Sequence, residues 1–457
     1  MASPLSNRTY RRLFTAQVIA LAGTGLSTVA LALLAFELAG RDAGIVLGTA
    51  LALKMVAYVG IAPIVGGLAH KLPRRQFLIA LDVARAVLVT FLPFVTEIWQ
   101  IYLLIFLLNA FSAGFTPTFQ ATIPDVLPDE AQYTRALSLS RLAYDLENLL
   151  SPTLAAAALL LLSFDALFAA NAVAFLVSAL LVFSIQLPSP KSHDRERGVW
   201  HNTSFGIWAY LKTPRLRGLL ALSFAAAAGG AMVIVNTVVY VRDRLGGSET
   251  DTALALAAVG AGSMIVALLL PRLLDRYPDR PFMLAGGFVM TIGLLLGLTE
   301  PGLIALLPVW FLIGAGSSLI LTPAGRLLMR SAHEGDRPAI YAAQFALSHV
   351  CWLVAYPLAG WVGGTLGLSA AFSVLAVATL VSTGAALVLW PAHDPGDLEH
   401  AHAPTDHQHL HVHDEHHQHE HEGWEGPEPH RHPHRHEAVK HKHAYVIDMH
   451  HRAWPNP

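Results

Sequence analysis

Twelve apolar stretches, each long enough to form a helix across a lipid bilayer, constrain the fold of this chain more than any other feature. A helix takes about 20 apolar residues to cross the hydrocarbon core. Charged residues make up only 14% of the 457 positions, against about 25% in a soluble domain. Because backbone polar groups in lipid must bond within the protein, helices are the favoured spanning element. We predict an all-α membrane protein with twelve transmembrane helices, at 13–39, 44–69, 77–97, 101–124, 136–162, 165–187, 216–241, 250–274, 281–299, 303–324, 339–364 and 368–391.

A polar interruption that begins at Pro188 divides these stretches into two sets of six. It is the longest polar segment before the C-terminal tail. We therefore expect a six-helix lobe at 1–187, an interlobe linker at 188–215, a second six-helix lobe at 216–391 and a tail at 392–457.

The two sets also repeat one another. Pro117 and Pro152 in the first set are matched by Pro323 and Pro357 in the second, about 205 residues later. Internal repeats of this size are typical of two-lobed secondary transporters.

Lys and Arg residues are distributed unevenly between the two sides of the predicted bundle. Only Arg41, Arg242 and Arg244 fall on one side, whereas the loops of the other side carry nearly all the rest. Because cytoplasmic loops carry the excess of Lys and Arg, we expect the linker, both termini and the tail to be cytoplasmic. The chain is then a multi-pass protein of the inner (plasma) membrane. The basic N-terminus runs into the first stretch without a cleavage site, which indicates a retained span.

Ionisable side chains in the fifth stretch call for a partner or a function, since each costs about 2.5–3.5 kcal/mol at the bilayer centre. Arg141, Asp145 and Asn148 share one helix face, with Glu147 beside it. Arg141 and Asp145 can neutralise each other at i, i+4, which is the structural alternative. Glu147 is left over by that pair. We predict that Asp145, Glu147 and Asn148 line a substrate path, through metal binding, proton exchange or both.

The eleventh stretch carries Gln344, Ser348, His349 and Cys351 among apolar neighbours. Imidazole suits divalent transition metals, and a thiolate adds affinity for the softer ions. His349 and Cys351 lie about 200° apart around a helix, so both face one ion only if the helix is distorted near Pro357. We favour His349 as the ligand. The alternatives are a His349 bonded to a neighbouring helix and a Cys351 that fills a core.

Three further ionisable residues lie in the second and third stretches. Lys54 has no local partner, and we expect it to pair with Asp145 or Glu147. Asp82 and Arg85, at i, i+3, are expected to neutralise each other near the cytoplasmic end of their helix, with a structural or gating role rather than a substrate-binding one.

The tail beyond residue 391 contains 19 of the 24 histidines. Low-complexity sequence with interleaved acids and prolines buries no core, so we expect it to be disordered without a ligand. Closely spaced imidazoles on a flexible chain can wrap a divalent ion. A purification tag or a merely solubilising tail are the alternatives. The predicted tail ligands are His407, His409, His411, His413, His416, His417, His419, His421, His430, His432, His434 and His436.

These features resemble the major facilitator superfamily. Its loop signature, Gly-x-Leu-Ala-Asp-Arg-x-Gly-Arg-Arg/Lys, is approached by residues 66–75 (GGLAHKLPRR) and more loosely by residues 271–280 (PRLLDRYPDR). His70 stands where the family has Asp, and Pro73 where it has Gly. In the family that Asp helps to latch one conformation, so the resemblance implies an altered latch in the first lobe. The implied gating residues are Gly67, His70, Arg74, Arg75, Asp275 and Arg276.

Within the superfamily, the chain resembles nickel-resistance exporters of the NreB type, which combine this fold with a His-rich tail. The segments that carry the resemblance are residues 144–148 (YDLEN), residues 347–352 (LSHVCW) and the tail. The resemblance implies export of Ni(II), with Co(II) as a further cargo.

The sequence thus favours a carrier rather than an enzyme. No Gly-x-x-x-x-Gly-Lys-Ser/Thr signature occurs, so ATP is not the expected energy source. Acids and histidines release metal as they protonate, which favours proton antiport. We expect a monomer without a resident cofactor, whose partners are a divalent metal ion, protons and the bilayer, and not nucleic acid. The alternatives are an exporter of an organic siderophore or drug-like molecule and, less favoured, a metal sensor that no longer transports.

Overall fold

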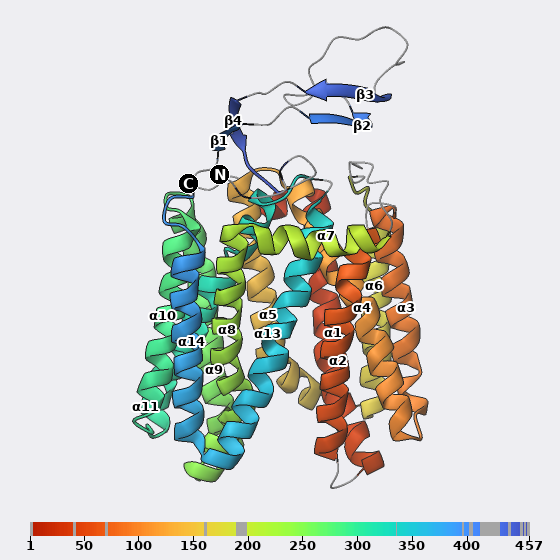
Figure 1. The fold of residues 1–457 in the computed structure, drawn as a ribbon. Helices are drawn as coiled ribbons and strands as arrows, with labels where there is room; N and C mark the ends of the chain where they lie inside the picture. The colour runs from red at the N-terminus through yellow and green to blue at the C-terminus, as the bar shows by residue number, and fades with distance from the viewer. Residues whose placement is uncertain are drawn as a thin grey trace.

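A computed structural model shows a bundle of long helices with a small strand region at one end (Figure 1). It describes residues 3–39, 43–68, 72–159, 162–188, 199–334, 336–394, 397–401, 405–411, 430–436, 440–447, 451 and 454. The helices of the first half are α1 (Arg8–Ala39), α2 (Ala43–Leu68), α3 (Arg74–Thr90), α4 (Ile98–Val126), α5 (Glu130–Leu159) and α6 (Phe164–Phe183). Those of the second half are α8 (Pro214–Val239), α9 (Glu249–Leu274), α10 (Asp279–Gly297), α11 (Leu303–Leu321), α12 (Ala324–Arg330), α13 (Arg337–Leu366) and α14 (Leu368–Leu389). Short turns complete the helical part: η1 (Pro4–Ser6), η4 (Leu92–Phe94) and the π-helical η5 (Tyr240–Arg244).

The predicted helical membrane fold is confirmed. Each of the twelve apolar stretches corresponds to one long helix, and the tenth is broken into α11 and α12 at Pro323, which has no backbone N–H to continue the ladder. Among the described residues, ten helical segments are long and apolar enough to cross a membrane. The described part of α2 adds a shorter apolar stretch, Ala52–Gly66. The charged helix α5 is not among these segments.

Part of the predicted linker is itself a helix. α7 (Val199–Lys212) lies across the end of the bundle (Figure 1). Its Phe205, Ala209 and Tyr210 are buried in the core of the second half, whereas Trp208 and Leu211 are exposed. Pro214 then begins α8 at a first-turn position, where a missing N–H costs nothing.

The helices pack as two groups. In the first, α1 packs on α5 and α6, and α4 packs on α2 and α3; in the second, α8 packs on α13 and α14, and α11 packs on α9 and α10. The groups meet where α2 contacts α13 and α5 contacts α9. Small residues allow the close approach, since a Cβ on Gly66 would lie 2.4 Å from the Cβ of Ala342.

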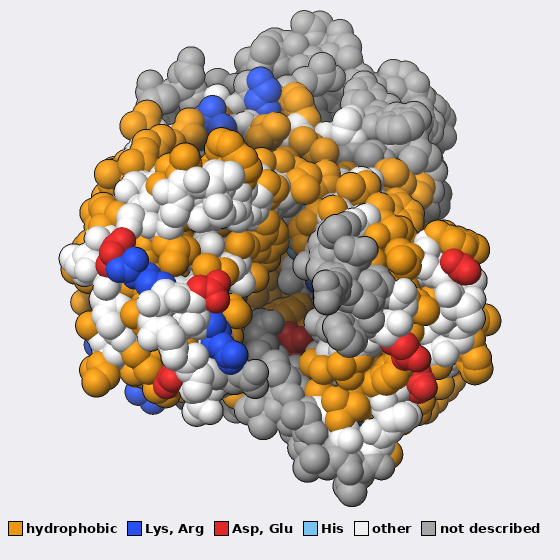
Figure 2. Space-filling view, turned by 90° about the horizontal axis from the view of Figure 1, so that it is seen from below, with side chains coloured by type: hydrophobic (Ala, Val, Ile, Leu, Met, Phe, Trp, Pro, Cys, Tyr) orange, Lys and Arg blue, Asp and Glu red, His pale blue; other side chains and the backbone are white. Residues whose placement is uncertain are grey.

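We call the end of the bundle that carries the N-terminus and α7 the terminal side, and the opposite end the far side (Figure 1). Seen from the far side, the molecule is hollowed at its centre between the two halves (Figure 2). The described part of its wall is mainly hydrophobic, and an acidic side chain is visible within it. The two halves are therefore apart on the far side.

Four short segments of the tail lie as strands, where the sequence predicted no regular structure. β1 (Asp397–Ala401) pairs with β4 (Lys440–Ala444), and β2 (Thr405–His411) pairs with β3 (His430–His436), both antiparallel. The alternation of His with other residues is a period-two pattern that suits a strand. Two-stranded pairs of this length are only marginally stable in water on their own. The segment that follows β4 packs against the bundle, because Tyr445, Val446 and Ile447 are buried.

Candidate functional site

A polar and aromatic cluster joins the two halves where α2 meets α13. Tyr58 of α2 packs edge-on against His349 of α13, with ring centroids 4.6 Å apart, and against Phe345, 4.9 Å away. Lys54, one turn before Tyr58, places its ammonium 5.5 Å from the Tyr58 ring centroid. We call Lys54, Tyr58, Glu147, Phe345 and His349 the central cluster.

The imidazole of His349 is held in one orientation. Its Nδ1 lies 2.7 Å from the carbonyl oxygen of Phe345, and the Phe345 ring packs on it at 4.2 Å. Because a carbonyl oxygen only accepts, Nδ1 carries the hydrogen of the neutral ring. The lone pair is then on Nε2, which is the arrangement of metal-ligating histidines whose other ring N–H is bonded to a carbonyl.

Glu147 of α5 is half-buried and lies within electrostatic range of Lys54. Lys54 is also within range of His349, so one ammonium faces both an acid and an imidazole. Of the two acids that the sequence offered as partners of Lys54, Glu147 is the one whose side chain the structure describes. The side chains of Arg141, Asp145 and Asn148 lie outside the described residues.

Tyr144 and its bonding partner Gln17 were not identified from the sequence as members of the site. Tyr144 hydrogen-bonds Gln17 of α1, and Ser140 donates to the Gln17 Oε1 atom at 3.2 Å. Tyr144 also lies within electrostatic range of Tyr58 and Glu147. Tyr58 therefore interacts both with His349 of the second half and with Tyr144 of its own half.

The other three polar residues predicted on α13 bond to different partners. Gln344 accepts from the Tyr210 hydroxyl and donates to Ser223 Oγ at 3.4 Å, so it ties α13 to α7 and α8. Ser348 donates back to the Phe345 carbonyl at 3.0 Å. Cys351 is buried in the core of the second half and donates to the Leu347 carbonyl at 3.3 Å. The structure therefore separates Cys351 from His349, as the 200° angle between them requires.

Asp82 and Arg85 form the expected ion pair, but they lie in the middle of α3 and not near its end. Ser178 of α6 donates to Asp82 at 2.7 Å. The Arg85 guanidinium lies between the rings of Phe115 and Phe175, 4.1 and 4.5 Å from their centroids. The pair is buried and fully surrounded by packing partners, which favours the structural role.

The terminal side is closed by polar contacts between the halves. The hydroxyl groups of Tyr133 and Tyr341 are 2.5 Å apart. Arg135 of α5 pairs with Asp275 at 3.4 Å. Asp125 at the end of α4 pairs with Arg74 of its own half and with Arg337 of α13. Asp125 thus links Arg74 of the predicted gating loop to α13 of the other half.

Of the remaining predicted gating residues, Arg75 bonds within its own half rather than between the halves. Arg75 donates to the Phe183 carbonyl at the end of α6, and its repeat equivalent Arg280 donates to Trp390 and Leu387 carbonyls at the end of α14. Arg276 lies in the loop after α9. His70 and the environment of Gly67 lie outside the described residues.

The strand register pairs histidines of the tail residue against residue. His407 is opposite His434, His409 opposite His432, and His411 opposite His430. Since alternate positions of a strand lie on one face, the three pairs occupy the same face of the ribbon. His436 is paired with Thr405. His413, His416, His417, His419 and His421 lie outside the described residues.

No group of three or more His, Cys, Asp or Glu side chains that could hold a metal ion occurs within the part of the chain that the structure describes. The central cluster supplies one imidazole and one carboxylate from opposite halves. Any ion held there would complete its coordination with water or with side chains beyond the described set.

The chain matches the family model of the Major Facilitator Superfamily twice, over residues 13–246 and 219–430. An uncharacterized MFS-type transporter of Bacillus subtilis (strain 168), YfiS, is 23% identical over 329 residues, which are 69% of this chain and 77% of that protein.

Two solved structures have the same fold. The human organic anion transporter MFSD10 (TETRAN) has a TM-score of 0.73 at 12% identity, over 83% of this chain and 99% of that one. A bacterial homologue of the iron transporter ferroportin, in an outward-facing state, has a TM-score of 0.67 at 15% identity, over 83% of this chain and 98% of that one. The family model spans both helix groups and the structures share their arrangement: the chain belongs to the Major Facilitator Superfamily and is a multi-pass membrane transporter of that fold.

Proposed function

We propose that this carrier exports a divalent transition metal, Ni(II) with Co(II) as a second cargo, in exchange for protons. The observation that carries the proposal is His349, whose Nδ1 is engaged by the Phe345 carbonyl and whose Nε2 is left as a metal ligand. Imidazole nitrogen and carboxylate oxygen are ligands that Ni(II) and Co(II) accept. His349 and Glu147 come from opposite halves. A rocking motion of the halves would therefore separate these two ligands and release a metal ion bound between them.

Lys54 gives the site a means of exchange. In the absence of cargo its ammonium offsets the charge of Glu147. An arriving dication competes with that ammonium, and a proton on Glu147 or His349 weakens both as ligands. On the more acidic side of the membrane, protonation of these ligands therefore drives release of the metal. On the other side, loss of the protons makes the ligands ready to bind the next ion.

The proposed direction is outward, with the terminal side in the cytoplasm. Arg8, Arg74, Arg135 and Arg326 lie at the terminal side, whereas Arg242 and Arg244 lie at the far side. The state with a closed terminal side and a far-side hollow is then outward-facing. The His-rich tail lies on the cytoplasmic side, where it collects ions before transport.

An organic siderophore or drug-like molecule is the second candidate cargo. Its support is aromatic: Tyr58 and Phe345 pack edge-on within the central cluster, and later on α13 Trp352 and Tyr356 form a tilted pair with ring centroids 5.0 Å apart. The organic anion transporter among the fold neighbours shares only the fold with this chain, so the cargo in its name describes that protein alone.

Everted membrane vesicles with an acid interior separate the two candidates. The metal proposal predicts pH-gradient-dependent Ni(II) accumulation, measured element by element, that His349→Ala abolishes and Cys351→Ala retains. Vesicles that accumulate an organic dye and no transition metal would establish the second candidate instead.

A further inference from the structure

The C-terminal segment of the chain docks onto the terminal side of the second half. Tyr445, Val446 and Ile447 are 5%, 5% and 3% exposed, and His451 is 4% exposed. The Tyr445 ring packs on His451 at 4.5 Å and on Trp454 at 5.1 Å. Tyr445 and Ile447 belong to the same hydrophobic cluster as the core of the second half, so this segment is packed as part of that lobe.

One guanidinium receives both ends of the His-rich segment. Arg215, in the first turn of α8, donates from Nη2 to the Tyr445 carbonyl at 3.1 Å. Its Nη1 pairs with Asp394 at 3.4 Å, and Trp454 lies beneath it, 5.1 Å from ring centroid to guanidinium carbon. Asp394 precedes the His-rich segment and Tyr445 follows it. The residues that flank the His-rich segment on both sides therefore bind the same guanidinium.

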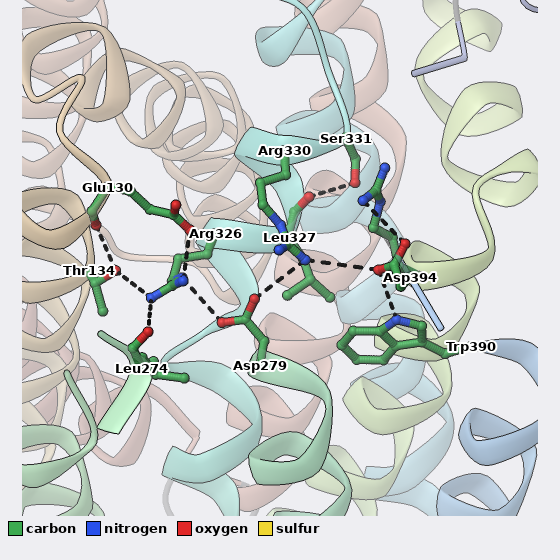
Figure 3. Close-up of polar contacts among 11 residues, drawn as sticks. Glu130, Thr134, Leu274, Asp279, Arg326, Leu327, Arg330, Ser331, Trp390 and Asp394 are labelled. Atoms are coloured by element: carbon green, nitrogen blue, oxygen red, sulfur yellow. Dashed lines mark hydrogen bonds and ion pairs between the residues drawn. The ribbon is translucent and has the colours of Figure 1, made fainter. Parts of the chain in front are cut away.

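The same aspartate leads to the contact between the halves (Figure 3). Asp394 accepts from Trp390 Nε1 at 3.1 Å and lies 3.9 Å from Arg330. Arg330 lies 3.5 Å from Asp279, which lies 3.2 Å from Arg326 Nε. Acidic and basic side chains therefore alternate along this series of ion pairs.

The last member of the chain crosses to the first half. Arg326 pairs with Glu130 of α5 at 2.7 Å and donates to Thr134 Oγ1 at 3.2 Å. It also donates to the Leu274 carbonyl at the end of α9. These contacts must separate if the terminal side is to open.

We propose that Tyr445, Val446, Ile447, His451 and Trp454 form an intramolecular latch: docked at Arg215, they fix Asp394 and, through Arg330 and Asp279, hold Arg326 on Glu130, so that they stabilise the closed terminal side. Without the docked segment, Arg215 loses the hydrogen bond to the Tyr445 carbonyl and no longer holds Asp394 in place. Arg330 is then free to leave Asp279. The inference requires a carrier that alternates between two states, and it does not depend on which cargo is moved.

Distances between spin labels on the two halves test the latch in the full-length protein without added metal. Pro128 and Tyr277, both exposed on the terminal side, are replaced by Cys in a Cys351→Ser background, since Cys351 is the single cysteine. The undisturbed chain should give a short distance. Termination after residue 444 and the Tyr445→Ala/Ile447→Ala variant should each add a population at longer distance.

Tyr445→Phe is the matched control, because it keeps the ring and the main-chain carbonyl and should leave the distances unchanged. Arg330→Gln interrupts the route from Asp394 to Asp279 and should open the terminal side by itself. Adding the Tyr445→Ala/Ile447→Ala change to Arg330→Gln should then give no further increase, since groups that act in series are not additive. Unchanged distances in both docking variants, or full additivity with Arg330→Gln, would overturn the latch. Absence of metal transport would overturn the proposed function and leave the latch intact.

Discussion

The Nδ1 atom of His349 lies 2.7 Å from the carbonyl oxygen of Phe345, one helical turn earlier on α13. Tyr58, from the other half, packs edge-on against the same imidazole. The imidazole is thus held by its own helix on one side and by the opposite half on the other. Movement of the two halves relative to one another therefore changes its surroundings. This makes His349 the residue on which the transport proposal depends most directly.

Replacing His349 by Ala should therefore reduce Ni(II) transport by more than about 10-fold, the lower end of what loss of ligand support costs at metal sites. The measurement is initial uptake into everted vesicles at matched protein abundance. Cys351→Ala is the control, because this thiol is buried in the second half and bonded to Leu347. Wild-type uptake by the His349 variant would contradict the assignment.

The interaction of Lys54 with Glu147 predicts a rescue. Glu147→Gln leaves the ammonium without its acid, at a cost of no more than about 2.5–3.5 kcal/mol for a charge in the membrane. The thermal midpoint in detergent should fall, and the Lys54→Gln/Glu147→Gln double variant should regain much of it. Transport should be absent in both. A double variant less stable than either single one would show that the two side chains do not act as a pair.

The twelve helices were predictable because apolar length is a local property, whereas the closed terminal side was not. Asp125, Glu130 and Asp394 stand at helix ends, where a polar residue is unremarkable in the sequence. Their partners Arg337, Arg326 and Arg215 lie far along the chain, and only the packing of α4 on α13, of α5 on α12 and of α8 on α14 brings each pair together.

The central cluster was half predictable for the same reason. An ionisable residue in an apolar stretch stands out because placing it in the membrane costs free energy. This identified Lys54, Glu147 and His349. Tyr58 and Phe345 are ordinary apolar residues of their helices, and their role follows only from the contact of α2 with α13. The contact of Gln344 with Tyr210 was not predictable either, because Tyr210 lies on the unpredicted helix α7.

The buried pair of Asp82 and Arg85 predicts a loss of stability rather than a specific loss of transport. Asp82→Asn leaves the guanidinium between Phe115 and Phe175 without a counter-charge, which should cost about 3–5 kcal/mol. Asp82→Asn/Arg85→Gln should cost less. Thermal unfolding in detergent measures both. An Asp82→Asn variant of full stability that no longer transports would assign the pair to the transport cycle instead.

The tail register predicts which histidines share an ion. Cross-strand neighbours have Cβ atoms about 4.5–5.5 Å apart, close enough for two imidazoles to bind one metal. His407→Ala/His434→Ala removes one such pair, whereas His407→Ala/His432→Ala disrupts two. Equilibrium Ni(II) binding by the purified full-length protein should fall further in the second variant. Equal losses would indicate that Ni(II) binding does not depend on which histidines lie opposite each other in the strand pair.

The far side offers a test of pH dependence at Glu300, between α10 and α11. Its backbone has a φ of 52°, unusual for a residue other than glycine. The carboxylate accepts a hydrogen bond from Ser369 of α14 and pairs with Arg244 after α8. The Ser369 hydrogen bond, and next the charge of Arg244, lower the pKa of Glu300 below its usual value of 4.5.

A carboxyl group whose pKa is lower in the folded state stabilises that state above its usual pKa, and the contribution disappears as pH falls through the folded-state value. The wild-type protein should therefore have a higher thermal midpoint than Glu300→Gln at pH 7, and the difference should shrink below about pH 4.5. Ser369→Ala should make the difference at pH 7 smaller and should end its decline at a higher pH, because the folded-state pKa of Glu300 then returns toward its usual value. Ser373→Ala, whose hydroxyl donates to the Ser369 carbonyl one turn earlier, is the matched control and should leave the profile unchanged. A difference between wild type and Glu300→Gln that stays constant from pH 7 to pH 4 would show that this carboxylate does not tie the far-side loops together.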